Sequence, residues 1–271
     1  MIGRREYEML SKLDKTLTET DLIKISEYEH SKKPIVTQSQ KDYFKKVHTA
    51  NKEFKIKIDS DKLLISFLKA FKHTECKEFN SGDGRGANLE TLINYFSKND
   101  AFLNSARLCR STDGKFISKP SFDKGLLIIG DFGCGKSSMM RAFKTLFDGH
   151  SLTFKSYTTN KIVTNFESYT DTSERTAYMN RTKTKTAYFD DVKTEKEASN
   201  YGLHNLMKDI IEERYNNNAL TYMTCNYVLN DSSKSIPNAL REFDSKYGAR
   251  VFDRLFEMFN IIEFKGSSLR K

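Results

Sequence analysis

The stretch Gly125–Ser138, GLLIIGDFGCGKSS, decides the fold of this chain. Its apolar run Leu126–Ile129 predicts a buried strand, and a helix is expected to begin near Lys136. Between them stands the pattern G-x-x-x-x-G-K-S, whose fixed positions are Gly130, Gly135, Lys136 and Ser137. Because strand, loop and helix follow in this order, the pattern predicts a phosphate-binding loop rather than a chance glycine-rich turn.

Each residue type in this loop has a physical reason. Glycines let the backbone turn its N–H groups inward, where a side chain would collide with a phosphate. The helix start adds unpaired N–H groups and a positive dipole end. Lys136 can reach the β- and γ-phosphates of ATP, and the Ser137 hydroxyl can bind Mg²⁺. The predicted nucleotide-binding residues are Gly130, Asp131, Phe132, Gly133, Cys134, Gly135, Lys136, Ser137 and Ser138.

Strand and helix patterns alternate along the chain after this loop. Apolar or alternating runs predict strands at 152–157, 186–191, 219–226 and 261–264. Helical spacing predicts helices at 203–215, 238–247 and 249–258, the last two separated by Gly248. Strands that alternate with helices indicate a three-layer α/β fold around a mostly parallel sheet.

The chain before the loop is predicted to contain a separate, mainly helical region. Residues 5–30 favour a helix, EFKIKI at 53–58 a half-exposed strand, and residues 60–73 an amphipathic helix. Residues 80–88, NSGDGRGAN, favour a linker because they are rich in glycine and polar side chains. We therefore expect an N-terminal region of residues 1–85 and a nucleotide-binding domain of residues 86–271.

Composition narrows the classes of protein. The 271 residues carry a formal net charge of +9, which suits a nucleic-acid partner only weakly. The four cysteines form no C-x-x-C pair, which argues for a reducing compartment and against a zinc site. The charged start MIGRREYEML is unlike a signal peptide, and the longest apolar run is too short for a bilayer. We expect a cytoplasmic protein without a membrane partner.

Two aspartates, Asp190 and Asp191, follow the strand pattern that ends in Tyr188–Phe189. Ligands of open α/β sheets bind at the carboxyl ends of the strands, where these carboxylates are expected. We expect Asp190 to hold Mg²⁺ together with Ser137, and Asp191 to orient or deprotonate the attacking water. Without the upstream loop, the same pair would equally suit a solvated turn.

Further polar residues have both a functional and a structural interpretation. Asn226 ends a strand pattern and could contact the γ-phosphate or the attacking water, or only form a turn. Arg250 and Arg254 share a helix face and could stabilise a transferring phosphoryl group, or pair with acidic neighbours on the helix surface. Arg270 could be a functional arginine or a solvated chain end.

The order of these motifs resembles the DnaC/IstB-type AAA+ ATPases, which are helicase loaders and transposition helper ATPases. The similarity covers roughly residues 120–271 and rests on GDFGCGKSS, YFDDV-x-x-E, a YG followed by a helix reaching Glu213–Arg214–Tyr215, TCN, YGARVFDRLFEM and S-x-R. It implies a P-loop NTPase fold of the AAA+ type, with a five-stranded sheet and a minimal C-terminal lid. Residues 86–271 would then be the AAA+ ATPase domain, and residues 1–85 a partner-binding region.

The resemblance also implies residue roles. Asp190 and Asp191 match the Mg²⁺ and hydrolysis pair, and Asn226 matches the sensor residue on the fourth strand. Arg254 matches the arginine finger that reaches a neighbour's γ-phosphate, which implies a homo-oligomer, and Arg250 could support the same interface. Arg270 matches the second sensor arginine. Many AAA+ proteins carry glutamate where this chain has Asp191, and the shorter side chain predicts slow hydrolysis.

The resemblance further implies ATP-dependent assembly on DNA, with single-stranded DNA favoured. A basic stretch with phosphate-binding composition is the predicted DNA contact, or else a solvated polar loop: Arg175, Arg181, Lys183 and Lys185. The predicted function is a Mg²⁺-dependent ATPase that loads or remodels a replication protein, foremost a replicative helicase. The alternatives are a transposition helper that marks duplex DNA, and a nucleotide-gated DNA-binding protein with negligible turnover. A metabolic or nucleoside kinase is disfavoured because it would leave Asn226 and the C-terminal arginines without a role.

Overall fold

The computed structural model describes residues 58–112, 115–116, 119–199, 203–229 and 231–269. The chain divides before Lys57 into two units, and the second unit contains every element described below. The helix expected at 5–30 and nearly all of the strand expected at 53–58 lie outside the described residues. None of the helices in the described part is both long and apolar enough to cross a membrane.

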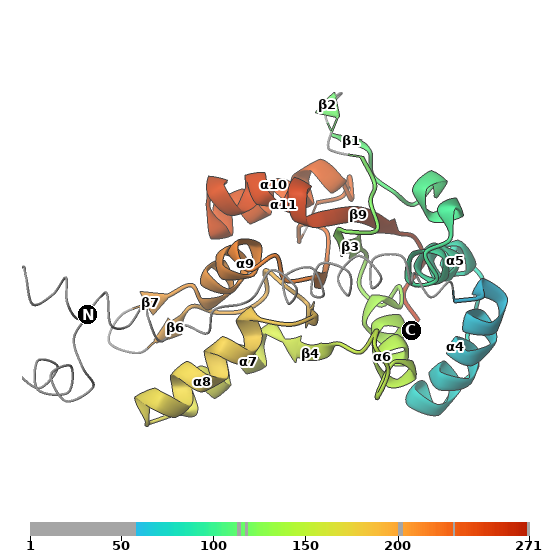
Figure 1. Cartoon of the computed structure of the whole chain (residues 1–271). Coiled ribbons are helices and arrows are strands. Elements are labelled where there is room, and N and C mark those ends of the chain that lie inside the picture. Colours follow the sequence, from blue (N-terminus) through green and yellow to red (C-terminus); the bar gives the residue numbers. More distant parts are fainter. Residues whose placement is uncertain (1–57, 113–114, 117–118, 200–202, 230, 270–271) are drawn as a thin grey trace, which may run out of the picture. The chain divides into compact units, whose positions relative to one another are not determined.

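A five-stranded parallel sheet forms the centre of the fold (Figure 1). In spatial order its strands are β4 (Lys155–Thr158), β5 (Ala187–Asp190), β8 (Thr221–Cys225), β3 (Gly125–Gly130) and β9 (Phe259–Phe264). Strand β3 lies between β8 and β9, with Ile129 beside Cys225 and Gly130 beside Phe264. The loop that follows β3 therefore begins at the middle of the carboxyl edge of the sheet.

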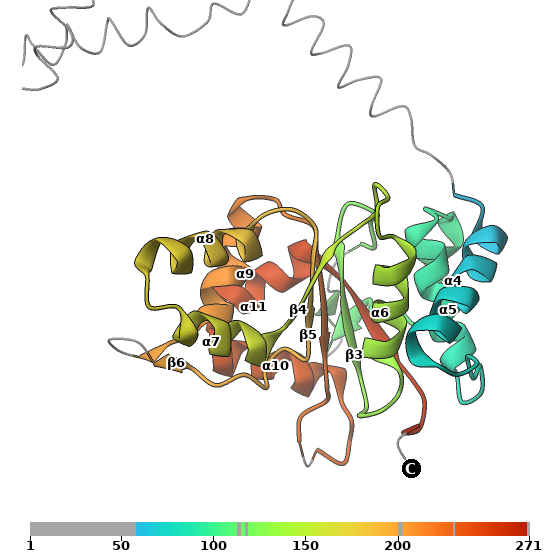
Figure 2. The ribbon, with the colours of Figure 1, turned by 90° about the horizontal axis from the view of Figure 1, so that it is seen from below.

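Helices cover both faces of this sheet (Figure 2). One face is covered by α7 (Thr159–Ser168), α8 (Thr172–Lys183), α9 (Leu206–Asn216), α10 (Ile236–Tyr247) and α11 (Ala249–Met258). The opposite face is covered by α4 (Ser60–Glu75), α5 (Arg85–Phe96) and α6 (Lys136–Leu146). These layers confirm the predicted three-layer α/β fold of the P-loop NTPase class.

Side chains of β3 alternate between two apolar cores. Leu127 and Ile129 face the core formed with α7, α9, α10 and α11. Leu126 and Ile128 face the core formed with α4, α5 and α6. All four side chains are fully buried. A central parallel strand covered on both faces is apolar at every position, which explains the continuous apolar run in the sequence.

The two edges of the sheet differ. Along β9, Leu108 forms an antiparallel bridge with Ile262, and the N–H of Cys109 donates to the carbonyl of Ile261 at 2.9 Å. Along β4, the outermost strand on the other side, Lys155 and Ser156 are exposed. The remaining elements are η1 (Asp100–Asn104) and two small hairpins, β1 (Ser111–Thr112) with β2 (Lys115–Phe116), and β6 (Ala198–Ser199) with β7 (Leu203–His204).

The domain boundary expected at residue 85 is corrected by the packing of α4. This helix lies in the same compact unit as the sheet, and the ring of Phe67 packs on Phe143 of α6 with centroids 4.6 Å apart. The expected linker at 80–88 is also wrong, because Arg85 begins α5 and is itself buried. Asn88 is buried as well, and its amide donates to the carbonyl of Lys265 at 2.7 Å. These polar residues hold the C-terminal segment rather than separate two domains.

Candidate nucleotide-binding site

A cleft of about 480 Å³ opens at the carboxyl edge of the sheet. Because β3, β5 and β8 are parallel, the residues that follow them meet at this edge. The cleft is lined by Glu75, Lys77, Phe132, Gly133, Gly135, Lys136, Ser137, Ser138, Arg141, Thr158, Asp190, Asp191, Thr224, Asn226 and Leu269. The structure thus brings together the phosphate-loop motif, the two aspartates and Asn226, which lie far apart in the sequence.

The phosphate loop leads directly into helix α6. Gly135 is the N-cap residue at φ 100°, a conformation that favours glycine, and it has no side chain that could cap the first turn. The unpaired N–H groups and the positive end of the helix dipole therefore face the cleft, which suits an anion. Lys136 is 7% exposed, and its Nζ donates to the carbonyls of Gly130 and Asp131 at 2.9 and 2.8 Å.

Three of the predicted loop residues do not line the cleft. Cys134 is fully buried beneath the loop. Asp131 pairs with Lys234, and this ammonium group lowers the pKa of the Asp131 carboxyl. Gly130 is the last residue of β3, where its carbonyl receives the Lys136 bond. These residues shape the loop, while the N–H groups and side chains that follow them face the cleft.

Asp190 is the centre of a cluster of hydroxyl groups. Its Oδ1 accepts hydrogen bonds from Ser137 at 2.7 Å, from Tyr188 at 2.6 Å and from Thr224 at 2.6 Å. Burial raises the pKa of Tyr188 well above its ordinary value, so this phenol stays a donor. A carboxylate beside a serine hydroxyl is an oxygen donor set of the kind that Mg²⁺ accepts together with phosphate and water oxygens. The residues present therefore fit this ion.

Asp191 is held in a fixed position beside Asp190. Its backbone has φ 60°, a conformation that aspartate tolerates better than most residues. Its carbonyl accepts hydrogen bonds from the hydroxyls of Thr159 at 2.9 Å and Thr194 at 2.7 Å. Its Oδ1 accepts from the amide of Asn226 at 2.8 Å. The carboxylate is consequently oriented by β8 as well as by its own loop.

Asn226 joins the two halves of the site. Its Nδ2 donates to Asp191, and its Oδ1 accepts from Lys136 at 2.9 Å. This geometry agrees with an amide oriented for chemistry rather than one that only forms a turn. The amide connects the group that can bind phosphate with the group that can activate water.

Arg254 stands at the other end of the sheet. Its guanidinium lies 4.4 Å above the ring of Tyr215, and its Nη1 is a buried atom without a hydrogen-bond partner among the described residues. Helix α11 ends beside Gly125, the first residue of β3, whereas the phosphate loop follows the last. The strand between spans roughly 17 Å at the usual rise per residue. Arg254 is thus separated from the cleft of its own chain, and Arg250 is exposed on the same helix.

The C-terminal segment crosses the phosphate loop. The N–H of Leu269 donates to the carbonyl of Gly133 at 3.2 Å, and a Cβ on Gly133 would collide with Ser268. Arg85 fixes this segment through the carbonyl of Ser267 at 3.3 Å. Arg270 follows Leu269 directly and lies outside the described residues.

The residues predicted to contact DNA fall into two groups. Arg175 is half-buried, donates to the carbonyl of Tyr169 and lies 5.1 Å from the ring of Phe166, so it fixes the turn between α7 and α8. Arg181 and Lys185 are exposed and line one cleft of about 760 Å³ beside β4, and Lys183 at the end of α8 is half-buried. Residues 175–183 are helical rather than a loop, but most of them are exposed, so the alternative of a solvated polar segment stays open beside the DNA contact.

Sequence reasoning missed several residues around the cleft. Glu75, at the end of α4, accepts from the Ser138 hydroxyl at 2.9 Å and pairs with Arg141 at 2.9 Å. Tyr188 was expected only as an apolar strand residue, yet it donates to Asp190. Neither the strand pattern around Tyr188 nor the helical pattern that ends near Glu75 gives a sign of these contacts, which depend on tertiary packing.

No family model matches the chain, and no curated protein matches it. Solved structures do match it in fold. The DnaC helicase loader is 19% identical over 73% of this chain and 99% of its own, with a TM-score of 0.44. DnaI is 15% identical over 74% and 93%, with a TM-score of 0.45. A protein from Streptococcus pyogenes serotype M3, described as a candidate primosome component, is 16% identical over 74% and 91%, with a TM-score of 0.44.

Proposed function

We propose that this protein is a Mg²⁺-dependent ATPase that assembles on DNA and loads or remodels a replication protein, foremost a replicative helicase. The observation that carries the proposal is the continuous set of bonds from Lys136 through Asn226 to Asp191, beside the Ser137–Asp190 pair. Nucleotide hydrolysis needs groups that bind the phosphates, ligands for a metal ion and a carboxylate that activates water. The cleft has residues suited to each of these roles.

In the proposed reaction, the α6 N-terminus and Lys136 bind the β- and γ-phosphates. Ser137 and Asp190 would hold Mg²⁺, which neutralises charge on the phosphate oxygens. Asp191 accepts a proton from a water whose oxygen attacks the γ-phosphorus, and the bond between that phosphorus and the β–γ bridging oxygen breaks. Asn226 keeps the Asp191 carboxylate oriented toward this water.

Arg254 would complete the site of a neighbouring subunit. A guanidinium at the opposite edge of the sheet cannot serve its own cleft, but it can reach another chain's cleft in a head-to-tail assembly. Its Nη1 has no hydrogen-bond partner among the described residues but is buried, so the side chain would have to turn away from Tyr215 to reach a neighbouring subunit. Arg250, exposed one turn earlier on α11, would line the same interface. Arg270 would act as the second sensor.

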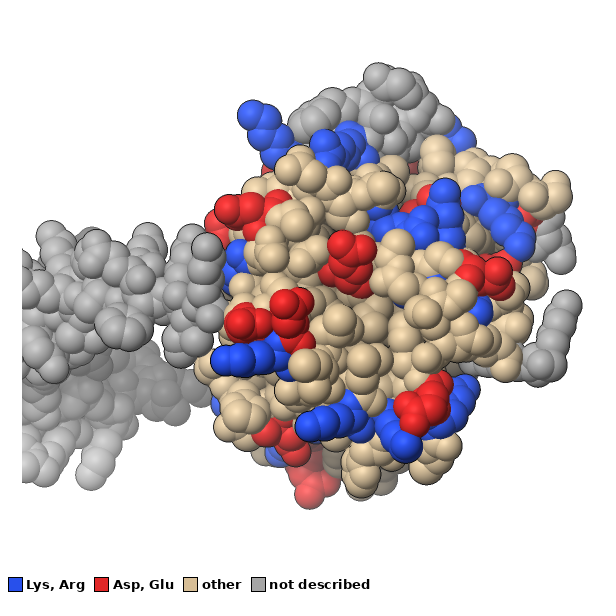
Figure 3. All heavy atoms as spheres, turned by 90° about the vertical axis from the view of Figure 1, so that its right-hand side faces the viewer, with Lys and Arg blue, Asp and Glu red and all other residues tan. Residues whose placement is uncertain are grey.

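DNA would bind on the side of β4 and α8. The cleft there gathers Lys155, Arg181 and Lys185, which suit phosphate contacts, and Lys144, which pairs with the acidic Asp148 of the same cleft. On the face that shows α4 and α5, lysines and arginines alternate with acidic side chains, and alternating charge suits a nucleic acid less well (Figure 3). The N-terminal region would bind the protein partner.

ATP turnover without DNA, with single-stranded DNA and with duplex DNA tests this function. We expect single-stranded DNA to stimulate turnover, and Lys136→Ala to abolish it in every condition. Stimulation by duplex DNA alone would instead favour a transposition helper. Tight ATP binding with negligible phosphate release would favour a nucleotide-gated binding protein and would contradict the proposed ATPase.

A further inference from the structure

Lys193 is a buried lysine in a strained backbone conformation. Its side chain is 5% exposed, and its φ of 79° lies in the left-handed region that favours glycine. A lysine in this conformation costs free energy, and it persists only where the surroundings hold it in place. Lys193 stands two residues after Asp191, so the strain is located beside the candidate hydrolysis site.

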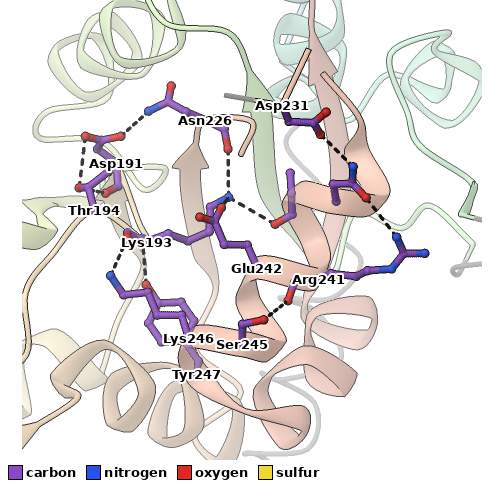
Figure 4. Close-up of polar contacts among 12 residues, drawn as sticks. Asp191, Lys193, Thr194, Asn226, Asp231, Arg241, Glu242, Ser245, Lys246 and Tyr247 are labelled. Carbon is purple, nitrogen blue, oxygen red and sulfur yellow. Dashed lines mark hydrogen bonds and ion pairs between the residues drawn. The ribbon is translucent and has the colours of Figure 1, made fainter. Parts of the chain in front are cut away.

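The ammonium group of Lys193 joins two parts of the molecule (Figure 4). Its Nζ donates to the backbone carbonyl of Asn226 at 3.0 Å. It also donates to the carbonyl of Ala239 at 3.3 Å and pairs with the Glu242 carboxylate, both on α10. The three donors of the ammonium group are therefore all used, one on the strand end that carries Asn226 and two on a helix.

The backbone of Lys193 is held by the same helix. Its N–H donates to the hydroxyl of Tyr247 at 2.9 Å, and its carbonyl accepts from the ammonium group of Lys246. Tyr247 also donates to the buried carboxylate of Glu195 at 2.7 Å. Main chain and side chain of Lys193 are thus attached to α10, which explains how the strained conformation is maintained.

We propose that Lys193 is a positioning residue that fixes Asn226 and couples it to α10, and through Gly248 to α11 and Arg254. The proposal rests on the proposed ATPase function and names a regulatory connection within it. It assigns to one residue the link between a chain's own phosphate site and the arginine that serves its neighbour.

The physical basis is a contiguous set of bonds. The Asn226 side chain contacts both Lys136 and Asp191, so a shift of Asn226 moves the carbonyl that Lys193 binds. Helices α10 and α11 pack on each other and share Gly248, whose φ of 88° lets the chain turn between them. These bonds can link Asn226 to Arg254 only if the residues are energetically coupled, and a double-mutant cycle measures that coupling.

The first experiment compares Lys193→Met with Lys196→Met, a control in the same loop whose side chain is exposed and pairs with Glu167. We expect Lys193→Met to lower kcat by about tenfold or more while the Kd for ATP stays within about threefold, because Asn226 and Asp191 act on the reacting groups rather than on binding. Lys196→Met should leave both quantities unchanged. Equal kcat values for wild type and Lys193→Met would overturn the proposal.

A second variant separates positioning from folding. Lys193→Gly relieves the positive φ but removes the ammonium group, and Glu242 is 38% exposed and can be hydrated instead. We expect Lys193→Gly to remain folded at the assay temperature, although the carbonyls of Asn226 and Ala239 lose a donor, and to show the same loss of kcat as Lys193→Met. Full turnover in Lys193→Gly would show that the ammonium group is dispensable.

The coupling to Arg254 is measured by a double-mutant cycle. We expect the combined loss of turnover in Lys193→Met/Arg254→Lys, in which the lysine keeps a cation and measurable turnover, to be smaller than the product of the two single losses. Losses that multiply would show two independent residues and would overturn the coupling. A wild-type protein without turnover would overturn the proposed function as well, whereas an active wild type with unchanged Lys193 variants would overturn only the link.

Discussion

At the scale of single residues, each reactive carboxylate of the site is oriented by a few hydrogen bonds. One carboxylate oxygen of Asp191 is held by the Asn226 amide, and one oxygen of Asp190 receives three hydroxyl donors. Charge-assisted bonds of this kind are short and directional. The arrangement leaves the two aspartates with different surroundings, which agrees with different roles for them.

Asp191→Asn tests the separation of binding and chemistry. The amide cannot accept the proton of the attacking water, so we expect kcat to fall by about 10²-fold or more. ATP binding should persist because Lys136, Ser137 and Asp190 are unchanged. Steady-state phosphate release measures kcat, and equilibrium titration with a fluorescent ATP analogue measures binding. Asp209→Asn, an exposed change on α9, is the matched control, and equal kcat values for both variants would contradict the assignment.

The residues of the site differ in how far the sequence predicted them. Lys136, Ser137, Asp190, Asp191 and Asn226 follow apolar strands, and the ends of parallel strands meet at one edge whatever the loops do. Tyr188 and Lys193 act through contacts that depend on the packing of β5 against β8 and α10. Such contacts have no local pattern, so sequence reasoning could not find them.

At the scale of elements, Arg214 locks the end of α9 to the sheet. The side chain is fully buried and donates to Thr221 Oγ1 and to four carbonyls, those of Thr182, Thr184, Lys185 and Leu220. These acceptors belong to the segment before β5 and to the start of β8. One guanidinium thereby aligns the two strands whose far ends carry Asp190 and Asn226.

Arg214→Lys should therefore destabilise the fold even though the charge is kept. An ammonium group has three donors and no planar fork, so buried carbonyls lose their partners. We expect the free energy of unfolding to fall by about 2–4 kcal/mol. Urea unfolding followed by circular dichroism gives this value. Arg250→Lys, at an exposed position, should change it by less than about 0.5 kcal/mol, and a similarly small loss for Arg214→Lys would refute the lock.

Element predictions failed where distant contacts outweigh local composition. Residues 80–88 have the composition of a linker, but Arg85 and Asn88 bind the backbone of residues 265–267 at the other end of the chain. Helix α8 was missed because it buries only Met179 and Thr182 and has little apolar periodicity. The central strand β3, which helices cover on both faces, and the amphipathic helix α11 were predicted within about two residues of their bounds.

At the scale of the whole molecule, aromatic packing makes the stability depend on alkaline pH. Burial raises the pKa values of Tyr95, Tyr188, Tyr222 and Tyr247 above the ordinary value of 10.0. Well below pH 10 these phenols are neutral in both the folded and the unfolded chain, so they do not lower the free energy of unfolding there. Above pH 10 the unfolded chain loses phenolic protons that the folded chain keeps, so the free energy of unfolding falls as pH rises.

Urea unfolding between pH 8 and pH 11 measures this dependence. We expect the urea midpoint to be constant up to about pH 9.5. Above pH 10 the free energy of unfolding should fall by about 1.4 kcal/mol per pH unit for each phenol that ionises only in the unfolded chain. Tyr95→Phe should reduce the slope, because it removes one of the buried phenols. A midpoint independent of pH would show that the buried phenols do not ionise on unfolding.

The central claim is that each ATP site is completed by Arg254 of a neighbouring chain, and mixing two inactive variants tests it most directly. Lys136→Ala lacks phosphate binding but retains Arg254, and Arg254→Ala retains the phosphate site. We expect each alone to be inactive and an equal mixture to recover about a quarter of wild-type turnover, because that fraction of head-to-tail contacts joins an intact site to an intact arginine. A mixture that stays inactive, or an Arg254→Ala protein that is active alone, would contradict the claim.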